Sequence, residues 1–444
     1  MKKSNGFFNV MVLIYIVLLL VACNDNPDNH SDNKENPTAL QKVEGVKGFS
    51  TINGYKVEEG KFYFSATKKN EWNFYSLDLE TQVLEKSHEE AGEYDLYIPI
   101  EEESAVYVDL EGQLFYRVGE EEKKIDEEIV GLHRPNLLIS PNKTAVLYTK
   151  GSREKADLYL YYLDQDQSKL IKENIGEDAF QTFSFTTQWS HKTNYFIFYN
   201  SEIYDDEGKY YSTLEATTAK WAPDDKYIVY IRKPQEKEEV LIGDWRTYIG
   251  TELALLQIEE KEDKTIYENP MGLVDPIDSI QWSKDASKVS ISTGEIIKAP
   301  HGEIEAVKYQ EVFVYNLDSE KGILVENMPY NYYEILFDNY LYGSSLGKRD
   351  ALELVEIYGK DRKVYENPVL LNSQDMFVIS HEKEAFFLDG EKLIRRSREG
   401  KEEVVLSIPW EVNEIYFDKK TKKIIITSRE VALYLFKLEE REES

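Results

Sequence analysis

Short runs in which apolar and polar residues alternate occur along most of this chain. Clear examples are KFYFSAT (61–67), NFYSLDL (73–79), TAVLYTK (144–150), DLYLYYL (157–163), KYIVYIR (226–232), EVFVYNL (311–317) and KIIITS (423–428). Side chains of a strand point alternately to opposite faces, so these runs predict strands, each half-buried. No run beyond the first 42 residues keeps a helical period. We therefore expect an all-β fold.

The alternating runs belong to a repeat. Each copy has an apolar anchor residue, a polar turn, a strand, a second turn and a second strand. The clearest copies begin at Ile139, Trp189, Trp221, Trp282, Ile379 and Phe417, and weaker ones at Val57, Ile100 and Phe337. The average spacing of about 45 residues is typical of a four-stranded propeller blade. Radial packing in a ring covers both faces of such sheets, so the repeat predicts one β-propeller over residues 43–440.

The repeat predicts the number of blades less directly than it predicts the fold. Nine anchors exceed the usual range, and only 32 residues separate Trp189 from Trp221. We expect about eight four-stranded blades, with seven as the alternative, and one anchor that begins no blade. The strand near 46–53 should close the ring by completing the last sheet, whose own strands lie within 414–438.

The turn Trp221-Ala222-Pro223-Asp224-Asp225, followed by an alternating strand, resembles the repeats of TolB-like β-propellers. The resemblance covers most of residues 50–440, although other copies lack the Pro, the Trp or the closing Gly. It implies an envelope propeller whose relatives commonly bind proteins. Trp189, Trp221 and Trp282 are expected in the core between blades rather than in a ring that stacks on a ligand. Trp72 and Trp410 are also expected in the core.

The N-terminus has the composition of an export signal. Lys2 and Lys3 precede an apolar run of about 16 residues, which is shorter than the roughly 20 of a spanning helix. Leu20-Val21-Ala22-Cys23 resembles the lipobox of bacterial lipoproteins, which implies a diacylglycerol on Cys23. We expect a signal peptide (1–22), then the lipidated Cys23 and a disordered tether (23–42), on the extracytoplasmic side of a bacterial cell membrane. The alternative is an uncleaved helix that buries Cys23.

The chain is strongly acidic, with 83 Asp and Glu against 53 Lys and Arg and a formal charge of −30. Such a field repels phosphate groups, so nucleic acid and direct adsorption to anionic lipid are disfavoured as partners. Basic proteins and cations remain possible. Acidic residues form no recognisable metal cluster, and we expect no metal and no cofactor.

Three short motifs imitate functional sites. Gly343-Ser344-Ser345-Leu346-Gly347 satisfies G-x-S-x-G, but a strand-like run follows where a nucleophile elbow needs a helix. The stretch 164–168 (DQDQS) begins like a calcium loop but has Lys169 where the loop needs Gly. Asp205-Asp206-Glu207-Gly208 could bind a cation. All three are expected to be turns.

Three neighbouring copies of the repeat contain additional residues. Residues 233–251 and 294–310 are inserted after equivalent strands, and 200–210 extends the same loop of the preceding copy. Equivalent loops emerge on one face of a propeller, so these three should lie side by side, where binding residues usually concentrate. The candidate binding residues are Asp244, Trp245, Arg246, Tyr248 and His301. Trp and Arg dominate many interfaces, but Trp245 could instead pin its own loop to the rim.

Two functions fit these features. The first is a non-catalytic, membrane-anchored scaffold that binds an envelope protein or polymer through its loop-bearing face. The second is a propeller hydrolase or lyase acting on extracellular glycan or peptide, with two carboxylates at the central mouth as acid and base. Because acidic residues are abundant everywhere, the sequence assigns no catalytic residue.

Overall fold

The structure of the chain is a computed structural model. It describes residues 40–438 except residues 70, 91–93, 102–103, 130, 132–134, 235–238, 243–244, 275–278, 300–303, 329–331, 337–338, 346–347, 360–361, 367–377, 382–383, 390–391, 398–399, 409, 411 and 419. Within these ranges the fold is almost entirely β, as the alternating pattern predicts.

The described residues form nine four-stranded antiparallel sheets. The first four comprise β2 (Phe49–Glu58), β3 (Lys61–Lys68), β4 (Glu71–Asp78) and β5 (Leu84–Glu90); β6 (Tyr94–Glu101), β7 (Ser104–Asp109), β8 (Leu114–Val118) and β9 (Glu121–Asp126); β10 (Leu137–Ile139), β11 (Ala145–Ser152), β12 (Lys155–Tyr162) and β13 (Gln167–Lys172); and β14 (Gln188–Trp189), β15 (Tyr195–Phe198), β16 (Glu202–Asp205) and β17 (Tyr210–Thr213).

The next four sheets comprise β18 (Ala216–Trp221), β19 (Tyr227–Arg232), β22 (Gly250–Gln257) and β23 (Glu262–Leu273); β24 (Ile280–Trp282), β25 (Lys288–Lys298), β26 (Ile304–Asn316) and β27 (Lys321–Glu326); β28 (Tyr332–Leu336), β29 (Tyr340–Ser345), β30 (Lys348–Glu356) and β31 (Arg362–Glu366); and β32 (Val378–His381), β33 (Glu384–Asp389), β34 (Lys392–Ser397) and β35 (Glu402–Ser407). The ninth joins β36 (Val412–Asp418), β37 (Lys423–Ser428) and β38 (Leu433–Lys437) to β1 (Gln41–Lys42).

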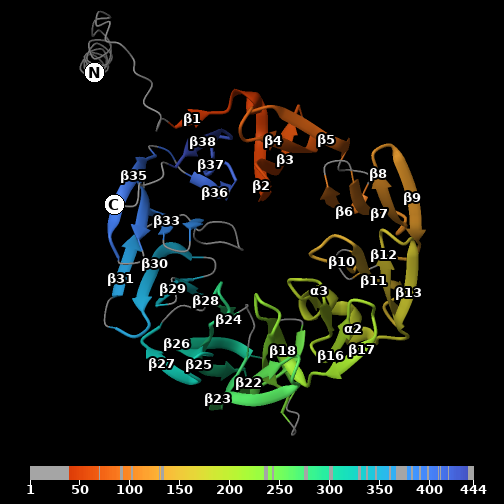
Figure 1. Ribbon diagram of the computed structural model, residues 1–444, viewed down its shortest axis with the longest axis vertical. Helices are drawn as coiled ribbons and strands as arrows, with labels where there is room; N and C mark the ends of the chain where they lie inside the picture. The colour runs from red at the N-terminus through yellow and green to blue at the C-terminus, as the bar shows by residue number, and fades with distance from the viewer. Residues whose placement is uncertain are drawn as a thin grey trace, which may run out of the picture.

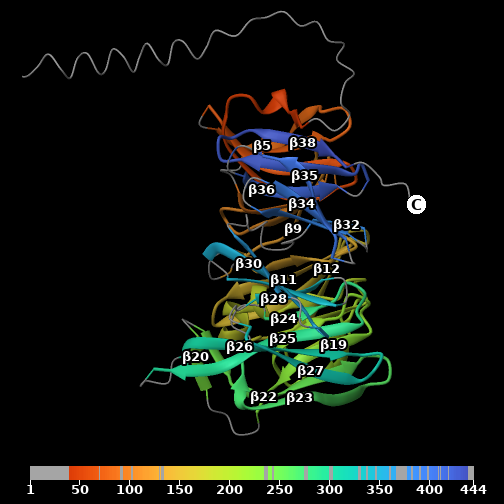
Figure 2. The same ribbon diagram turned by 90° about the vertical axis from the view of Figure 1, so that its left-hand side faces the viewer.

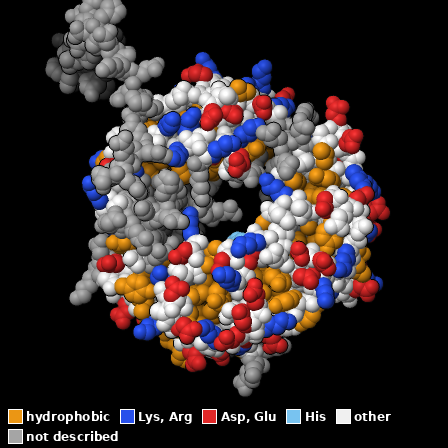
Figure 3. Space-filling model, viewed as in Figure 1, with side chains coloured by type: hydrophobic (Ala, Val, Ile, Leu, Met, Phe, Trp, Pro, Cys, Tyr) orange, Lys and Arg blue, Asp and Glu red, His pale blue; other side chains and the backbone are white. Residues whose placement is uncertain are grey.

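The sheets stand around a central opening, and the first and last are neighbours (Figure 1). Space-filling shows the same opening (Figure 3). Apolar clusters span the boundaries between sheets: Val146 and Val106 belong to one cluster, Val229 and Val289 to a second, and Phe62 and Ile425 to a third. Each fully buried side chain of this size stabilises the fold by about 1.5–3 kcal/mol. The fold is therefore a single β-propeller whose core lies between the blades.

The ring holds nine sheets, one more than the expected eight. The interval that seemed too short for a blade contains β14–β17, whose strands have only two to four residues. The anchors Val57, Ile100, Ile139, Trp189, Trp221, Trp282, Ile379 and Phe417 all lie at or near the end of the first strand of a sheet, and Phe337 lies outside the described residues. The expectation that one anchor begins no blade is therefore wrong.

The N-terminal segment completes the last sheet, as expected, but with different residues. Gln41 pairs with Leu435 and Lys42 with Tyr434, so β1 supplies the fourth strand. The segment 46–53, which we expected in this role, instead enters β2 of the first sheet. β1 also begins two residues before the expected start of the propeller at residue 43. Its pairing and the first sheet's contacts with β36 close the ring.

The tryptophan anchors pack between blades, as predicted. Trp221 is 3% exposed, and its ring stacks on Tyr195 of the preceding sheet with 6.0 Å between centroids. Trp189, Trp282 and Trp410 are half-buried against the apolar clusters. The side chain of Trp72 lies outside the described part.

Consecutive strands of each sheet are antiparallel, so the connections alternate between two faces of the ring. Connections from first to second and third to fourth strand lie on one face, which we call the turn face. Connections from second to third strand and from one sheet to the next lie on the other, the hairpin face. Two short helices, α2 (Glu177–Gln181) and α3 (Phe183–Thr186), belong to a sheet-to-sheet link and so to the hairpin face. A short 3₁₀ turn, Glu44–Val46, follows β1.

The described residues contain no helix long and apolar enough to span a membrane. Cys23 and the expected signal peptide and tether, up to residue 39, lie outside them.

Candidate functional site

An additional hairpin stands on the hairpin face between β19 and β22. It consists of β20 (Glu239–Ile242) and β21 (Trp245–Tyr248), which pair in register from Ile242 opposite Trp245 to Glu239 opposite Tyr248. It forms a two-stranded sheet of its own. Such a hairpin is at best marginally stable alone, so its packing against the ring decides whether it is ordered.

The second insertion is not a loop but an extension of two strands. β25 and β26 are among the longest in the fold, and their pairing continues from Gly294 opposite Tyr309 to Lys298 opposite Ile304. β26 pairs with β27 only over 311–316. The residues 294–298 and 304–310 thus form a two-stranded arm beyond the four-stranded sheet. Figure 2 shows β20 beyond the side of the ring, next to the end of β26.

The hairpin and the arm share a small core of their own. Val240 of β20, Val274 of the link after β23 and Ile304 of β26 are buried together, at 2%, 6% and 8% exposure. Ile249, Ile296 and Val307 pack against them. The prediction that the two insertions lie side by side is confirmed. The shared core supplies the packing that an isolated hairpin lacks.

A close approach of backbone and side chains makes this core possible. Gly272 has a φ of +101°, and a Cβ there would lie 2.4 Å from Cγ2 of Ile249 and 3.0 Å from Cδ1 of Ile296. A side chain at this position would therefore push the hairpin's base away from the arm. The glycine lets the end of β23 pass between them.

Exposed apolar side chains flank this assembly. Met271 is 64% exposed and Ile297 38% exposed. Asn269, itself buried, holds the turn before Met271: its Oδ1 accepts the N–H of Met271 at 3.0 Å, and its Nδ2 donates to the carbonyl oxygen of Gly272 at 3.1 Å. A buried amide thus holds the backbone that presents a flexible apolar side chain at the surface, a type common at binding surfaces.

The predicted binding residues are only partly described. Trp245 and Arg246 lie in β21, but their side chains are outside the described part. Tyr248 is half-buried, and Nζ of Lys233 lies 4.5 Å from the centroid of its ring. Asp244 and His301 lie outside the described residues. The recognition role of these five residues stays a prediction.

The third expected protrusion, 200–210, does not exist. This stretch contains β16 and its turns, in the smallest sheet of the ring. Asn200 is buried, and its Nδ2 donates to the carbonyl oxygen of Thr217 at 3.1 Å. The polar residues that suggested a long loop are thus used inside a compact blade. The hairpin face has two such protrusions in this sector, not three.

Sequence reasoning missed the residues that hold the site together. Val240, Val274 and Ile304 were hidden in stretches interpreted as loops. The alternation of Ile296, Val307 and Tyr309 with charged residues was a signal that could have predicted strands there.

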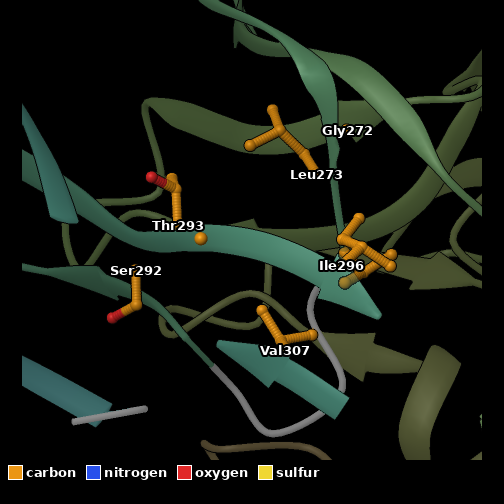
Figure 4. Close-up of a pocket in the computed structure, with 8 residues that line it drawn as sticks. Gly272, Leu273, Ser292, Thr293, Ile296 and Val307 are labelled. Atoms are coloured by element: carbon orange, nitrogen blue, oxygen red, sulfur yellow. The ribbon is translucent and has the colours of Figure 1, made fainter. Parts of the chain in front are cut away.

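One small cavity lies at the base of the arm, lined by Gly272, Leu273, Val274, Ser292, Thr293, Gly294, Ile296 and Val307 (Figure 4). Its volume is about 10 Å³, which is room for one water molecule. Ser292 is 3% exposed, and no partner for its hydroxyl is described. A bound water would satisfy such a group, but no organic ligand fits the cavity. Recognition at this site must therefore use its outer surface.

Two of the three misleading motifs lie mainly in turns, as predicted, but Gly343-Ser344-Ser345 lies in a strand, where we expected a turn. Gly343 lies in β29 and is followed by the strand β30 rather than a helix; a Cβ at 343 would clash with the ring of Tyr333. Residues 164–166 lie in the turn between β12 and β13, and Gln167 and Ser168 begin β13. In the turn after β16, Oδ1 of Asp205 accepts the N–H of Lys209 at 2.7 Å.

Within the described part of the chain, the carboxyl groups whose pKa is displaced have a lowered pKa rather than the raised pKa of a general acid. Hydrogen bonds from Thr81 lower the pKa of Asp78, and bonds from Lys124 and Lys123 lower those of Glu127 and Asp166. All three changes stabilise the charged form, whereas a general acid needs a raised pKa. Among the described residues no group of three or more His, Cys, Asp or Glu could hold a metal ion.

Comparisons with known proteins assign no family to this chain. No protein-family model and no curated protein matches the sequence. Among solved structures, an oligogalacturonate lyase in complex with manganese is similar at 13% identity and a TM-score of 0.40, over 93% of this chain and 96% of that one. BamB from Moraxella catarrhalis is similar at 9% identity and 0.39, over 79% and 95%. The β-propeller domain of the Trilobed protease from Pyrococcus furiosus is similar at 9% and 0.32, over 81% and 97%. At these values nothing about activity or partners transfers to this chain.

Proposed function

We propose that this chain is a non-catalytic scaffold, a TolB-like propeller lipoprotein anchored through Cys23 on the extracytoplasmic side of a bacterial membrane, which binds an envelope protein or polymer through its hairpin face. The lipobox-like residues before Cys23 and the absence of any second cysteine from the sequence support this membrane location. Two acyl chains give stable anchoring where one gives only marginal binding.

The hairpin–arm assembly is the observation that carries the proposal. It adds two inserted segments to an otherwise regular blade pattern, and a dedicated core of Val240, Val274 and Ile304 orders them. The ring does not need them for closure, because the four-stranded sheets are complete without them. Ordered, protruding structure beside the exposed Met271 and Ile297 is what a binding surface requires.

A catalytic function has less support. The hydrolase or lyase needs a pair of carboxylates in a deep pocket, one with a raised pKa. Glu414, on the inner strand β36, instead accepts the N–H of Gly54 at 2.9 Å, which ties the last sheet to the first. The displaced carboxyl pKa values are lowered.

The test is capture of partners from the native envelope after chemical crosslinking, with the full lipidated protein as bait. Replacing Trp245 and Arg246 together with Ala should abolish specific capture and leave the melting temperature nearly unchanged. Tyr358→Ala is the matched control, because Tyr358 is an aromatic residue 57% exposed in a third-to-fourth-strand connection, on the turn face. Unchanged capture by the double variant would refute the proposed surface. Loss of folding would mean that Trp245 pins its own hairpin.

A further inference from the structure

The arm has a backbone edge to which no described strand is paired. Residues 304–308 of β26 pair with β25 on one side, while on the other side no strand of the described part pairs with them, since β27 begins its pairing at Glu311. The hairpin β20–β21 contacts β26 but forms a separate sheet. The N–H and C=O groups of alternate residues within 304–308 therefore point away from β25.

The side chains along this edge leave it accessible. Glu305, Ala306 and Lys308 are exposed, whereas Ile304 and Val307 face the core shared with the hairpin. On the outer face of the arm, Ile297 lies opposite Ala306 and Glu295 opposite Lys308. Among the described residues, the arm thus has one buried face, one solvent face and, between them, an edge with no strand paired to it.

The outer edge of the second sheet is better protected against pairing with another strand. The outer strand β9 exposes Glu121, Glu122, Lys123 and Lys124 in succession, a run of charges that discourages pairing with another strand. Between Ile304 and Tyr309 the arm has only Glu305 and Lys308 as charged residues. The arm also stands beyond the ring, so a strand could approach it without meeting a neighbouring blade.

We propose that this edge binds an extended segment of a protein partner, which adds as a third strand to β25 and β26. This inference rests on the proposed function and narrows its partner from protein or polymer to polypeptide. A sheet edge presents donors and acceptors at the spacing of another peptide backbone, about 3.3 Å per residue, which a glycan does not match. On the solvent face, the added strand places an acidic residue beside Lys308 and an apolar residue, two positions away, beside Ala306.

The test uses a defined probe and the full-length protein in detergent micelles. The probe is a fluorescent octapeptide of alternating Thr and Val with Glu, Gln or Lys at its fourth position. Binding is measured by anisotropy, and hydrogen exchange reports the amides of β26. We expect the Glu peptide to bind about threefold more tightly than the Lys peptide, the size of a cross-strand charge pair, and to slow exchange within 304–309. Methylation of alternate peptide nitrogens should reduce binding at least tenfold in one register only.

Lys308→Glu should reverse the preference from the Glu to the Lys peptide, with only a small decrease in the melting temperature from the new carboxylate opposite Glu295. Lys226→Glu, at an exposed lysine in a turn-face connection, should leave the preference unchanged. No peptide binding, or binding indifferent to N-methylation and to Lys308→Glu, would overturn the inference. Self-association that protects the same amides without peptide would also overturn it, because the occupant would be a second copy of this chain. The peptides could bind as described while the double substitution of Trp245 and Arg246 leaves envelope capture unchanged. That result would refute the role proposed for these two residues but would support peptide binding at the edge of the arm.

Discussion

At the residue scale, buried carboxylates tie neighbouring blades together. Asp225 is 7% exposed, and its oxygens accept the N–H groups of His191 and Lys192, from the preceding sheet, at 2.7 and 2.5 Å. Its own φ is +63°, a conformation that Asn and Asp adopt more easily than other residues with a Cβ. The Asp of the repeat's turn is therefore a connector between blades rather than a ligand.

This connection can be tested by substitution. Asp225→Ala would remove two hydrogen bonds to a charged acceptor, from the N–H groups of His191 and Lys192, and should lower the free energy of unfolding by roughly 3 kcal/mol. Asp225→Asn keeps the backbone conformation and one acceptor oxygen, so we expect a loss of only about 1 kcal/mol. Denaturant titration measures both. Equal, small losses would show that water replaces the carboxylate at no cost.

The role of a residue could be predicted from the sequence where the residue occupies the same position in several copies of the repeat. The anchors Trp189, Trp221 and Trp282 share one repeat position, and this implied core packing. Val240 and Ile304 could not be paired in the same way, because 64 residues separate them and their contact depends on the lengths of two insertions. Local pattern predicts burial of a strand face, but it does not say which distant face covers it.

At the element scale, the ring is closed by a very short strand. β1 has two exposed residues, and the hydrogen bond from the N–H of Val43 to the carbonyl oxygen of Leu433, at 2.8 Å, extends its pairing. Val43 and Val46 are 1% and 2% exposed in the cluster that joins the first and last sheets. Closure therefore depends on these two valines more than on the side chains of β1.

We accordingly expect Val46→Ala to lower the free energy of unfolding by about 2 kcal/mol, from lost burial and the cavity left behind. Lys42→Ala should have almost no effect, because the exposed strand contributes through its backbone. Thermal unfolding compares the two. A larger loss from Lys42→Ala would mean that the closure depends on side chains of β1.

The hairpin should behave as a separate cooperative element. Val240→Ala removes packing from the small core shared with the arm and should raise amide exchange across 239–248 several-fold, while exchange in β19 and β22 stays slow. A change in the whole ring, with a clearly lower melting temperature, would show that the hairpin is part of the main core.

At the scale of the whole molecule, a formal charge of −30 acts against compactness. Salt screens this self-repulsion, with a Debye length of about 10 Å at 0.1 M. Raising NaCl from 20 to 300 mM should therefore increase the melting temperature by roughly 2 °C or more. A decrease would show that ion pairs such as Lys150–Asp126, whose nitrogen and oxygen lie 2.6 Å apart, outweigh the repulsion.

The propeller itself could be predicted from the chain because period and alternation are local properties repeated along it. The number of sheets could not, since β14–β17 fits a complete blade into an interval that looked too short. The sequence predicted that an N-terminal strand completes the last sheet, but it did not predict which residues form that strand. β1 is too short for an alternating pattern to appear. The location of the site could be predicted because neighbouring copies of the repeat carry insertions. Its geometry could not, because it depends on strands that continue through those insertions.

The central claim is that the hairpin face, at the arm, meets the partner. Its most direct measurement is in-cell photo-crosslinking with a photoreactive amino acid placed at Ile297, on the arm, or at Tyr358, on the turn face. We predict a discrete crosslinked species from position 297 that is lost in the Trp245→Ala, Arg246→Ala background, and none from position 358. Crosslinking from position 358 alone, or equally from both positions, would contradict the account.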